Sequence, residues 1–570
     1  MPLVDRLSFD RCELIGFASA LTAYRAGDID QALVSVKEIL SESPNDLYAL
    51  VLAADCFNHY GKFLESLGLV KAASSASNFA LEFVLVEVDQ LNILERYSDG
   101  LFCLDRVKLS LKSHSDWIWQ HIVQLDLLNR CIEASSELTN HINQLKKQEF
   151  FYQISSRIFG AAGHHDQALI LLNEWNYCLP SRESAKSLAD CLFVLGRHDE
   201  YVKVIGAASH SYPDDCNLKA LSLQAQCDQN SQNISDVIEL IRCEDDCCNR
   251  SPDFAFLAGQ LLLAQARFEE GWPLYENRLR IDSNGLYAAI LPELDDTQSV
   301  EGKNVLLVAE QGVGDVLLFA RFIPLLQREA DSVVFIVDQR LKPLMQRCLD
   351  GVTVVDNLSL AQALAGDNII VLAIASLGVR YLRAGSSISA FKSSSSIVPH
   401  PVLSRNWKTR LTDNRIHVGL SLTAGTHQTT YKSQKRSVPI RVVEDALCSV
   451  DVDVHDLQHF GSITSSAAAF KCIEHCGVTK DLDQLIALIG CLDILVTSDQ
   501  TNAFIAGSLG IPTLVIAPPN PHFALMAEGE VTPWFSSITL LRSCSWMGWD
   551  ELIDPFAQRF QALVSQVVQE

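Results

Sequence analysis

The chain has 570 residues, of which 48% are hydrophobic and 20% charged, and its formal net charge is −24 at pH 7. This length exceeds a single hydrophobic core, so about two to four domains are expected. The acidic charge argues against broad, sequence-independent binding to nucleic acid or anionic lipid, because phosphates would be repelled over most of the surface.

The 17 cysteines are scattered, and the tightest group, Cys243, Cys247 and Cys248, lacks a second pair at zinc spacing. We therefore expect free thiols in a reducing compartment. Charged residues interrupt the first 25 positions, which argues against a signal peptide, and no run of 18 apolar residues occurs. These features predict a soluble cytoplasmic protein without a membrane span.

The first half of the chain, residues 1–285, carries signals of a helical repeat. Small or turn-forming residues recur at a spacing of about 34 residues, which is typical of tetratricopeptide repeats (TPR); they are Gly27, Gly61, Asn129, Gly163 and Gly196. Position 230 and Ala266 continue the series poorly, and the unit near residue 95 is barely legible. Such a stack presents a concave surface that suits a protein or glycan partner; the alternative is a helical domain that only supports its neighbour.

After about residue 300 the pattern changes to short apolar runs separated by helical stretches, which is typical of parallel strands covered on both faces. The runs are residues 304–310, 332–338, 368–374, 417–422, 493–498 and 513–517. They predict two doubly wound α/β domains, at 300–400 and 405–570, joined through the Ser-rich segment 385–401.

Ligands of such sheets bind beyond the carboxyl ends of the strands, where "EQGVGD" places Gly312, Gly314 and Asp315 after the first strand. A dinucleotide fingerprint is excluded because Leu317 stands at its third glycine, and no GxxxxGK[ST] loop exists. Asp315 is placed for chemistry; alternatively it caps a helix that begins near Val316.

Five segments from Ala266 onward, in the same order, resemble the bacterial TPR glycosyltransferases whose catalytic half is similar to lipopolysaccharide heptosyltransferases of glycosyltransferase family 9. The segments are "ARFEEGWPLYENRLR" (266–280), "EQGVGD" with "FARFIPLL" (310–326), "HVGLSLTAGTHQTTYKSQKRSVPI" (417–440), "LDILVTSDQTNAFIAGSLGIPTLVIAP" (492–518) and "TPWFSSITLLRSCSWMGWDELIDPFAQRF" (532–560).

The resemblance implies a TPR-like α-solenoid followed by a GT-B fold, with an acceptor-side domain at 300–400 and a donor domain with a closing helix at 405–570. It implies transfer of a sugar from a nucleotide-diphosphate sugar without a metal or other cofactor, with Asp315 as the general base. The expected donor and phosphate contacts are Gly312, Gly314, Thr423, Gly425, Lys432, Lys435, Arg436, Asp499, Gln500 and Thr501. The basic cluster can alternatively be a solvated loop, and Asp499 a helix N-cap.

The chain departs from the family pattern at Gln500 and Phe504, where Thr and His are usual, and at "HFAL" (522–525), which replaces a Trp-rich acidic element. Besides a glycosyltransferase, two other functions therefore stay open. One is a binding module that has kept the fold but lost turnover, and the other is a nucleotide-sugar epimerase.

Overall fold

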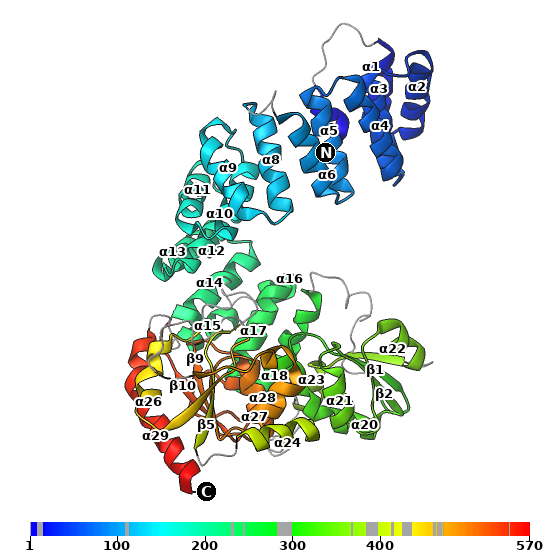
Figure 1. The fold of residues 1–570 in the computed structure, drawn as a ribbon. Coiled ribbons are helices and arrows are strands. Elements are labelled where there is room, and N and C mark those ends of the chain that lie inside the picture. Colours follow the sequence, from blue (N-terminus) through cyan, green and yellow to red (C-terminus); the bar gives the residue numbers. More distant parts are fainter. Residues whose placement is uncertain are drawn as a thin grey trace. The chain divides into compact units, whose positions relative to one another are not determined.

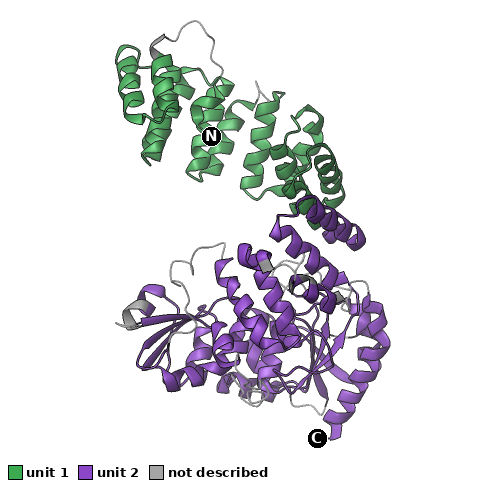
Figure 2. Cartoon of the chain, turned by 180° about the vertical axis from the view of Figure 1, so that it is seen from behind, with its two compact units in different colours: residues 1–191 green, residues 192–570 purple. Residues whose placement is uncertain are grey.

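The computed structural model describes residues 2–7, 15–108, 113–229, 233–242, 245–281, 299–365, 369–382, 397–411, 415–424, 436–459, 463, 470, 472–545 and 548–569. The chain forms two compact units, Met1–Cys191 and Leu192–Glu570 (Figure 2). The predicted boundary between helical repeats and α/β domains, at 285–300, lies almost entirely outside the described residues and stays a prediction.

The first unit consists of helices that pack as successive antiparallel pairs (Figure 1). In α2, for example, the Asp28 side chain accepts the N–H of Gln31 as an N-cap, and Ile29, Ala32 and Val36 form the buried face. The helices are α1 (Ile15–Arg25), α2 (Ile29–Glu42), α3 (Leu47–His59), α4 (Phe63–Ala76), α5 (Leu81–Ile93), α6 (Tyr97–Arg106), α8 (Ser115–Leu127), α9 (Cys131–His141), α10 (Glu149–Ala161) and α11 (His165–Cys178), and α12 (Arg182–Val194) crosses the boundary.

In the helical pairs whose turns the structure describes, the turn contains a left-handed residue, which explains the repeat spacing. Gly27, Gly61, Gly163 and Gly196 all have positive φ, and so do Glu95, Asn129 and Ala266. Glycine adopts this conformation without strain, whereas other residues do so at a cost. The unit near residue 95 was hard to read because Glu95, with a φ of 56°, stands where most other repeats have glycine.

The second unit begins with further repeat helices, which share a hydrophobic cluster with the α/β sheets. These helices are α13 (His198–Ser211), α14 (Cys216–Gln229), α15 (Asn233–Arg242), α16 (Asp245–Arg250), α17 (Pro252–Ala264), α18 (Phe268–Tyr275) and the 3-10 turn η3 (Glu276–Arg280). One hydrophobic cluster runs from α14 through both α/β sheets to the last strand. The last repeats therefore pack as part of the α/β unit.

The first sheet has four parallel strands in the order β3-β2-β1-β4. The strands are β1 (Asn304–Val308), β2 (Ser332–Ile336), β3 (Thr353–Val355) and β4 (Ile369–Ala373), and the associated helices are α19 (Val313–Phe319), α20 (Ile323–Glu329), α21 (Lys342–Cys348), α22 (Leu358–Ala365) and α23 (Ser376–Leu382). Every strand is followed by a helix, which is why the strands are parallel.

The second sheet has six parallel strands in the order β10-β9-β8-β5-β6-β7. They are β5 (Ile416–Ser421), β6 (Val452–Asp456), β7 (Cys472–Ile473), β8 (Ile494–Ser498), β9 (Thr513–Ala517) and β10 (Ile538–Arg542). The helices are α24 (Pro401–Arg410), α26 (Glu444–Cys448), α27 (Leu482–Ile489), α28 (Thr501–Leu509) and α29 (Ile553–Gln569). The amphipathic α29 closes the domain by burying Phe556, Phe560 and Val564 against it.

Two parallel sheets after a helical repeat confirm the predicted fold class, a TPR-like α-solenoid followed by two Rossmann-like domains in a GT-B fold. All six strands predicted from apolar runs are present. In the described part of the chain, no helix is long and apolar enough to cross a membrane.

Candidate active site

Asp315 lies in the opening turn of α19, shortly after the end of β1. Gln311 has a φ of 69°, which is uncommon for a residue with a side chain, and turns the chain from the strand into the helix. The Gly312 N–H donates to Asp315 Oδ2 at 3.3 Å, while the Asp315 side chain remains 18% exposed. Asp315 therefore helps to cap the helix, which begins at Val313 rather than near Val316, and still reaches solvent.

Asp499 follows β8 and is almost fully buried, with 1% exposure. Its Oδ2 accepts the backbone N–H of His522 at 2.9 Å, and within the described residues its Oδ1 has no hydrogen-bond partner. The N-cap position of α28 belongs to Gln500, so the alternative role of Asp499 as that cap is wrong. A buried carboxylate oxygen without a partner is the kind of group that a ligand or water satisfies.

Arg542, at the end of β10, supplies positive charge near Asp499. Burial lowers the pKa of the Arg542 guanidinium to about 10, and the Asp499 carboxylate opposes this shift. Arg542 Nε donates to the Gly529 carbonyl at 2.8 Å, while its buried Nη1 has no hydrogen-bond partner among the residues that the structure describes. In the described residues, this region of the second α/β domain thus holds one acceptor atom and one donor atom without hydrogen-bond partners.

His522 joins the two acids. Its Nε2 lies 3.1 Å from Asp315 Oδ1, and its backbone N–H is the donor to Asp499. Ala524 N–H donates to His522 Nδ1 at 3.2 Å, so Nδ1 is the acceptor and the ring proton of the neutral imidazole is on Nε2, facing Asp315. The structure thereby connects Asp315, from the first α/β domain, with Asp499, from the second.

His522 is not among the predicted site residues, because the segment "HFAL" (522–525) differs from the family pattern. A usable signal was present, since this segment follows β9, the neighbour of β8 in the sheet. Polar residues shortly after adjacent parallel strands meet at one edge of the sheet.

Helices α19 and α28 meet where Gly314 faces Phe504. A Cβ atom at Gly314 would lie 2.8 Å from Cδ2 of Phe504, closer than carbon atoms pack. Phe504 is 4% exposed, and its ring is 5.2 Å from that of His522 in an edge-on arrangement. Gly314 therefore has a packing role, and Phe504 forms an apolar wall beside His522.

The residues that follow Asp499 divide between two tasks. Gln500 Nε2 donates to the carbonyl and hydroxyl oxygens of Ser421, at 2.7 and 2.8 Å, and Asn502 Nδ2 donates to the same hydroxyl at 3.0 Å. Both amides thereby connect the chain after β8 to the end of β5. Thr501 instead points its Oγ1 toward Gly314, 3.5 Å from a Cβ built there, and so lies near the Asp315 turn.

The predicted phosphate loop starts at the carboxyl end of β5. Thr423 N–H donates to Gln458 Oε1 at 2.9 Å, and Gln458 Nε2 donates to Thr423 Oγ1 at 2.7 Å. Ala424 N–H donates to Ser437 Oγ at 3.2 Å, so the two ends of the loop meet. Arg436 lies at the second end; Gly425, Lys432 and Lys435 lie outside the described residues.

A cavity of about 340 Å³ opens beside the Gln311–Gly312 turn, at the carboxyl edge of the first sheet. Its walls are mostly apolar and come from β1, α19 and the end of β2. Asp338 and Arg340 also line it and form a two-point ion pair, with distances of 2.9 and 3.0 Å. The volume falls within the range of about 300–1,000 Å³ that is usual for small-ligand sites.

Metal ligands do not gather in the part of the chain that the structure describes: no group of three or more His, Cys, Asp or Glu side chains is placed to hold an ion. Metal independence nevertheless stays a prediction, because it depends on the reaction and not on these residues alone.

Comparison with known proteins gives distant similarities, and no family model matches the chain. Protein FlbA of Caulobacter vibrioides is 23% identical over 418 residues, which span 62% of this chain and 69% of that protein. Among solved structures, the glycosyl transferase family 9 protein from Veillonella parvula is 13% identical, covers 48% of this chain and 100% of its own, and has a TM-score of 0.33. The E. coli ADP-heptose lps heptosyltransferase II is 13% identical, with 46% and 99% coverage and a TM-score of 0.33.

A tetratricopeptide repeat protein from Parabacteroides merdae is also 13% identical, with 48% and 95% coverage and a TM-score of 0.32. Any activity must therefore be inferred from the chain's own site.

Proposed function

We propose that this chain is a glycosyltransferase that moves a sugar from a nucleotide-diphosphate sugar to a hydroxyl group of an acceptor, with Asp315 as the general base. The observation that carries the proposal is the Asp315–His522–Asp499 connection, which assembles a partly exposed carboxylate, an imidazole and a buried carboxylate from two domains. In α/β sheets, ligands bind at this carboxyl edge of the strands.

In this mechanism the acceptor oxygen attacks the anomeric carbon, the bond from that carbon to the diphosphate oxygen breaks, and the acceptor proton passes to Asp315. One Asp315 oxygen accepts from Gly312 and the other from His522. Each carboxylate oxygen has a second acceptor position, so Asp315 can still take the incoming proton. The neutral His522 ring holds the carboxylate in place, and a positioned base typically contributes about 10²–10⁴-fold to the rate.

The leaving diphosphate requires positive charge, which we assign to Lys432, Lys435 and Arg436 on the loop between Ala424 and Ser437. The observation that supports this assignment is the hydrogen bond from Ala424 N–H to Ser437 Oγ, which brings the two ends of the segment together. Ala424 lies shortly after β5, and β5 is the neighbour of β8 in the sheet. Charge-assisted hydrogen bonds to phosphate are the strong class of such bonds. No metal is needed in this scheme.

The donor sugar is assigned to the region of Asp499 and Arg542. Asp499 Oδ1 and Arg542 Nη1 are buried polar atoms that lack partners in the described part of the chain. A sugar hydroxyl donates and accepts, so it suits both groups. Thr501, two residues after Asp499, points its Oγ1 toward Gly314 in the Asp315 turn.

For the acceptor we propose a protein or glycan that is selected with help from the helical repeats. Stacked helical hairpins form extended binding surfaces, and the apolar cavity beside Gly312 is suited to a side chain or aglycone next to the acceptor hydroxyl. The cavity contributes only two acids and one arginine, Arg340, which is already paired with Asp338.

The competing function is a protein-binding module of the same fold without turnover. Phe504 and Gln500 favour it, since the Phe504 ring has no polar group and the Gln500 Nε2 donates to Ser421. His522 counts against it, because this ring supplies an imidazole at the site although Phe504 replaces the expected histidine.

The two functions differ in an experiment that begins with thermal unfolding in the presence of UDP, GDP, ADP and CDP. A nucleotide at 100 times its Kd stabilises the native state by about 2.7 kcal/mol, so the correct base raises the Tm. The corresponding nucleotide-sugars are then tested for release of that diphosphate. Binding of a nucleotide without release of the diphosphate supports the binding module. If no nucleotide binds and no diphosphate is released, both the donor site and the enzyme are contradicted.

A further inference from the structure

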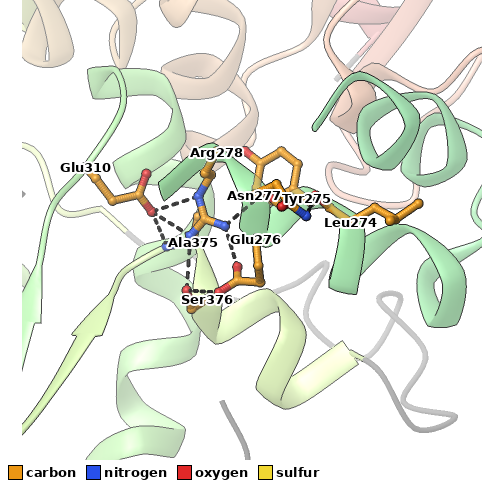
Figure 3. A network of polar contacts seen from close by, with 8 residues as sticks. All are labelled: Leu274, Tyr275, Glu276, Asn277, Arg278, Glu310, Ala375 and Ser376. Atoms are coloured by element: carbon orange, nitrogen blue, oxygen red, sulfur yellow. Dashed lines mark hydrogen bonds and ion pairs between the residues drawn. The ribbon is translucent and has the colours of Figure 1, made fainter. Parts of the chain in front are cut away.

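Arg278, in the 3-10 turn after the last repeat helix, enters a buried polar network (Figure 3). Its side chain is 2% exposed. Nη2 donates to Glu310 Oε1 at 2.9 Å and to Ser376 Oγ at 3.1 Å, and Nη1 pairs with Glu276. The planar guanidinium can make all three contacts at once, which a lysine ammonium could not do in the same geometry.

Glu310 connects this network to the site, because it stands between β1 and Gln311. Its Oε1 also accepts the N–H of Ala375 at 3.0 Å, directly after β4. One carboxylate therefore joins the ends of two neighbouring strands to the last repeat. A buried ion pair adds little to stability, since desolvation offsets much of its attraction. The network is therefore better explained as a device that holds one conformation of this part of the chain.

The rest of the last repeat packs close to the same turn. Trp272 lies against Gly378, where a Cβ would meet its ring at 2.6 Å. The Tyr275 ring is 5.3 Å from that of Phe523, the neighbour of His522, and the Asp315 carboxylate adds to the rise in the pKa of Tyr275 that burial causes. The last repeat thus contacts residues of both α/β domains near Asp315: Gly378 in the first and Phe523 in the second.

We propose that Arg278 is a positioning residue for Asp315: it holds Glu310 in place, and through Glu310 it fixes the strained Gln311–Gly312 turn from which Asp315 enters α19. The last repeat is then a component of the catalytic unit as well as part of a binding surface. The effect on turnover rests on the proposed function, whereas the effect on the turn does not.

The test uses the full-length double variant Arg278→Met/Glu310→Gln, which removes both buried charges together and leaves an acceptor for the Ala375 N–H. The matched control is Arg347→Met/Asp483→Asn, which removes a partly buried ion pair that joins the two α/β domains elsewhere, 2.6 Å long in the wild type. Three properties are measured: thermal unfolding, amide hydrogen exchange of residues 309–316, and the kcat and KM for the donor.

We expect exchange in 309–316 to accelerate at least about tenfold in the double variant, through local opening, and to be unchanged in the control. We expect kcat to fall roughly 10- to 100-fold with an unchanged KM for the donor, because misplacing a reacting group affects the chemical step. If the double variant does not melt cooperatively, Arg278→Lys provides the same comparison.

Wild-type exchange in 309–316, in a variant that folds, would overturn the proposal. This arm decides even if the wild type transfers no sugar, so failure of the positioning role and failure of the proposed enzyme can be told apart. Faster exchange with unchanged kcat would also reject Arg278 as a positioning residue and leave it a purely structural role.

Discussion

The contact between Gly314 and Phe504 predicts that one substitution has opposite effects in two backgrounds. Gly314→Ala places a methyl group 2.8 Å from Cδ2 and 3.3 Å from Cε2 of Phe504, and 3.5 Å from Thr501 Oγ1. In the wild type, one helix or the buried ring must therefore move. In a Phe504→Val background both ring carbons are gone, and the methyl group has space.

The magnitudes follow from two opposing terms. Alanine is favoured over glycine in a helix by up to about 1 kcal/mol, and forcing a methyl group into a packed contact costs about 1–3 kcal/mol. Gly314→Ala should therefore destabilise the wild type by about 0–2 kcal/mol. It should stabilise the Phe504→Val variant by about 0.5–1 kcal/mol.

Urea unfolding of the full-length chain, followed by tryptophan fluorescence, measures both effects, because Trp272 and Trp534 are fully buried in the second unit. The four proteins form a double-mutant cycle with an expected coupling of about 0.5–3 kcal/mol. A change of the same sign and size in both backgrounds would show that α19 and α28 do not meet at these residues.

The remaining predictions concern three other sites. His522→Ala removes the hydrogen-bond donor to Asp315 but keeps the backbone N–H that donates to Asp499. We therefore expect kcat to fall roughly 10- to 100-fold, while the affinity for the nucleotide-sugar, measured by calorimetry, is unchanged. Lys435→Ala with Arg436→Ala should weaken nucleotide diphosphate binding by about 1.5–3 kcal/mol per lost contact at low salt; unchanged affinity would place the phosphates elsewhere. In the first unit, burial raises the pKa of Asp55 to about 6, so the native state binds this proton more tightly than the unfolded state. Stability should fall by about 2 kcal/mol from pH 4 to 6.5, and the Asp55→Asn variant should lack this component.

Much of the fold could be predicted because its periodic signals are local. Apolar runs covered on both faces identified six strands, and the repeat turns were visible wherever glycine supplies the left-handed residue. The apolar runs did not identify β3 or β6. β3 is only three residues long, and the polar residues of β6, with the sequence "VDVHD", conceal a strand. β10 lies inside the segment interpreted as the closing stretch.

The candidate site was only partly accessible from the sequence. Asp315 and Asp499 follow recognisable strands, so their placement at strand ends was predictable. His522 was missed because its importance comes from the contact with Asp315, 207 positions away. The polar role of Arg278 likewise depends on Ser376, 98 positions later. Such long-range pairs carry no periodic signal; the sequence can place His522 after a strand, but it does not show which residue it contacts.

The most direct test of the central claim is sugar transfer by the Asp315→Asn variant, compared with wild type at saturating donor and acceptor. The amide oxygen can still accept the Gly312 N–H, so the helix cap survives, but the side chain can no longer take a proton. We expect turnover to fall by at least about 10²-fold, with thermal unfolding and nucleotide affinity close to wild type. Transfer at the wild-type rate would contradict the account, leave Asp315 as a helix cap and favour the binding module.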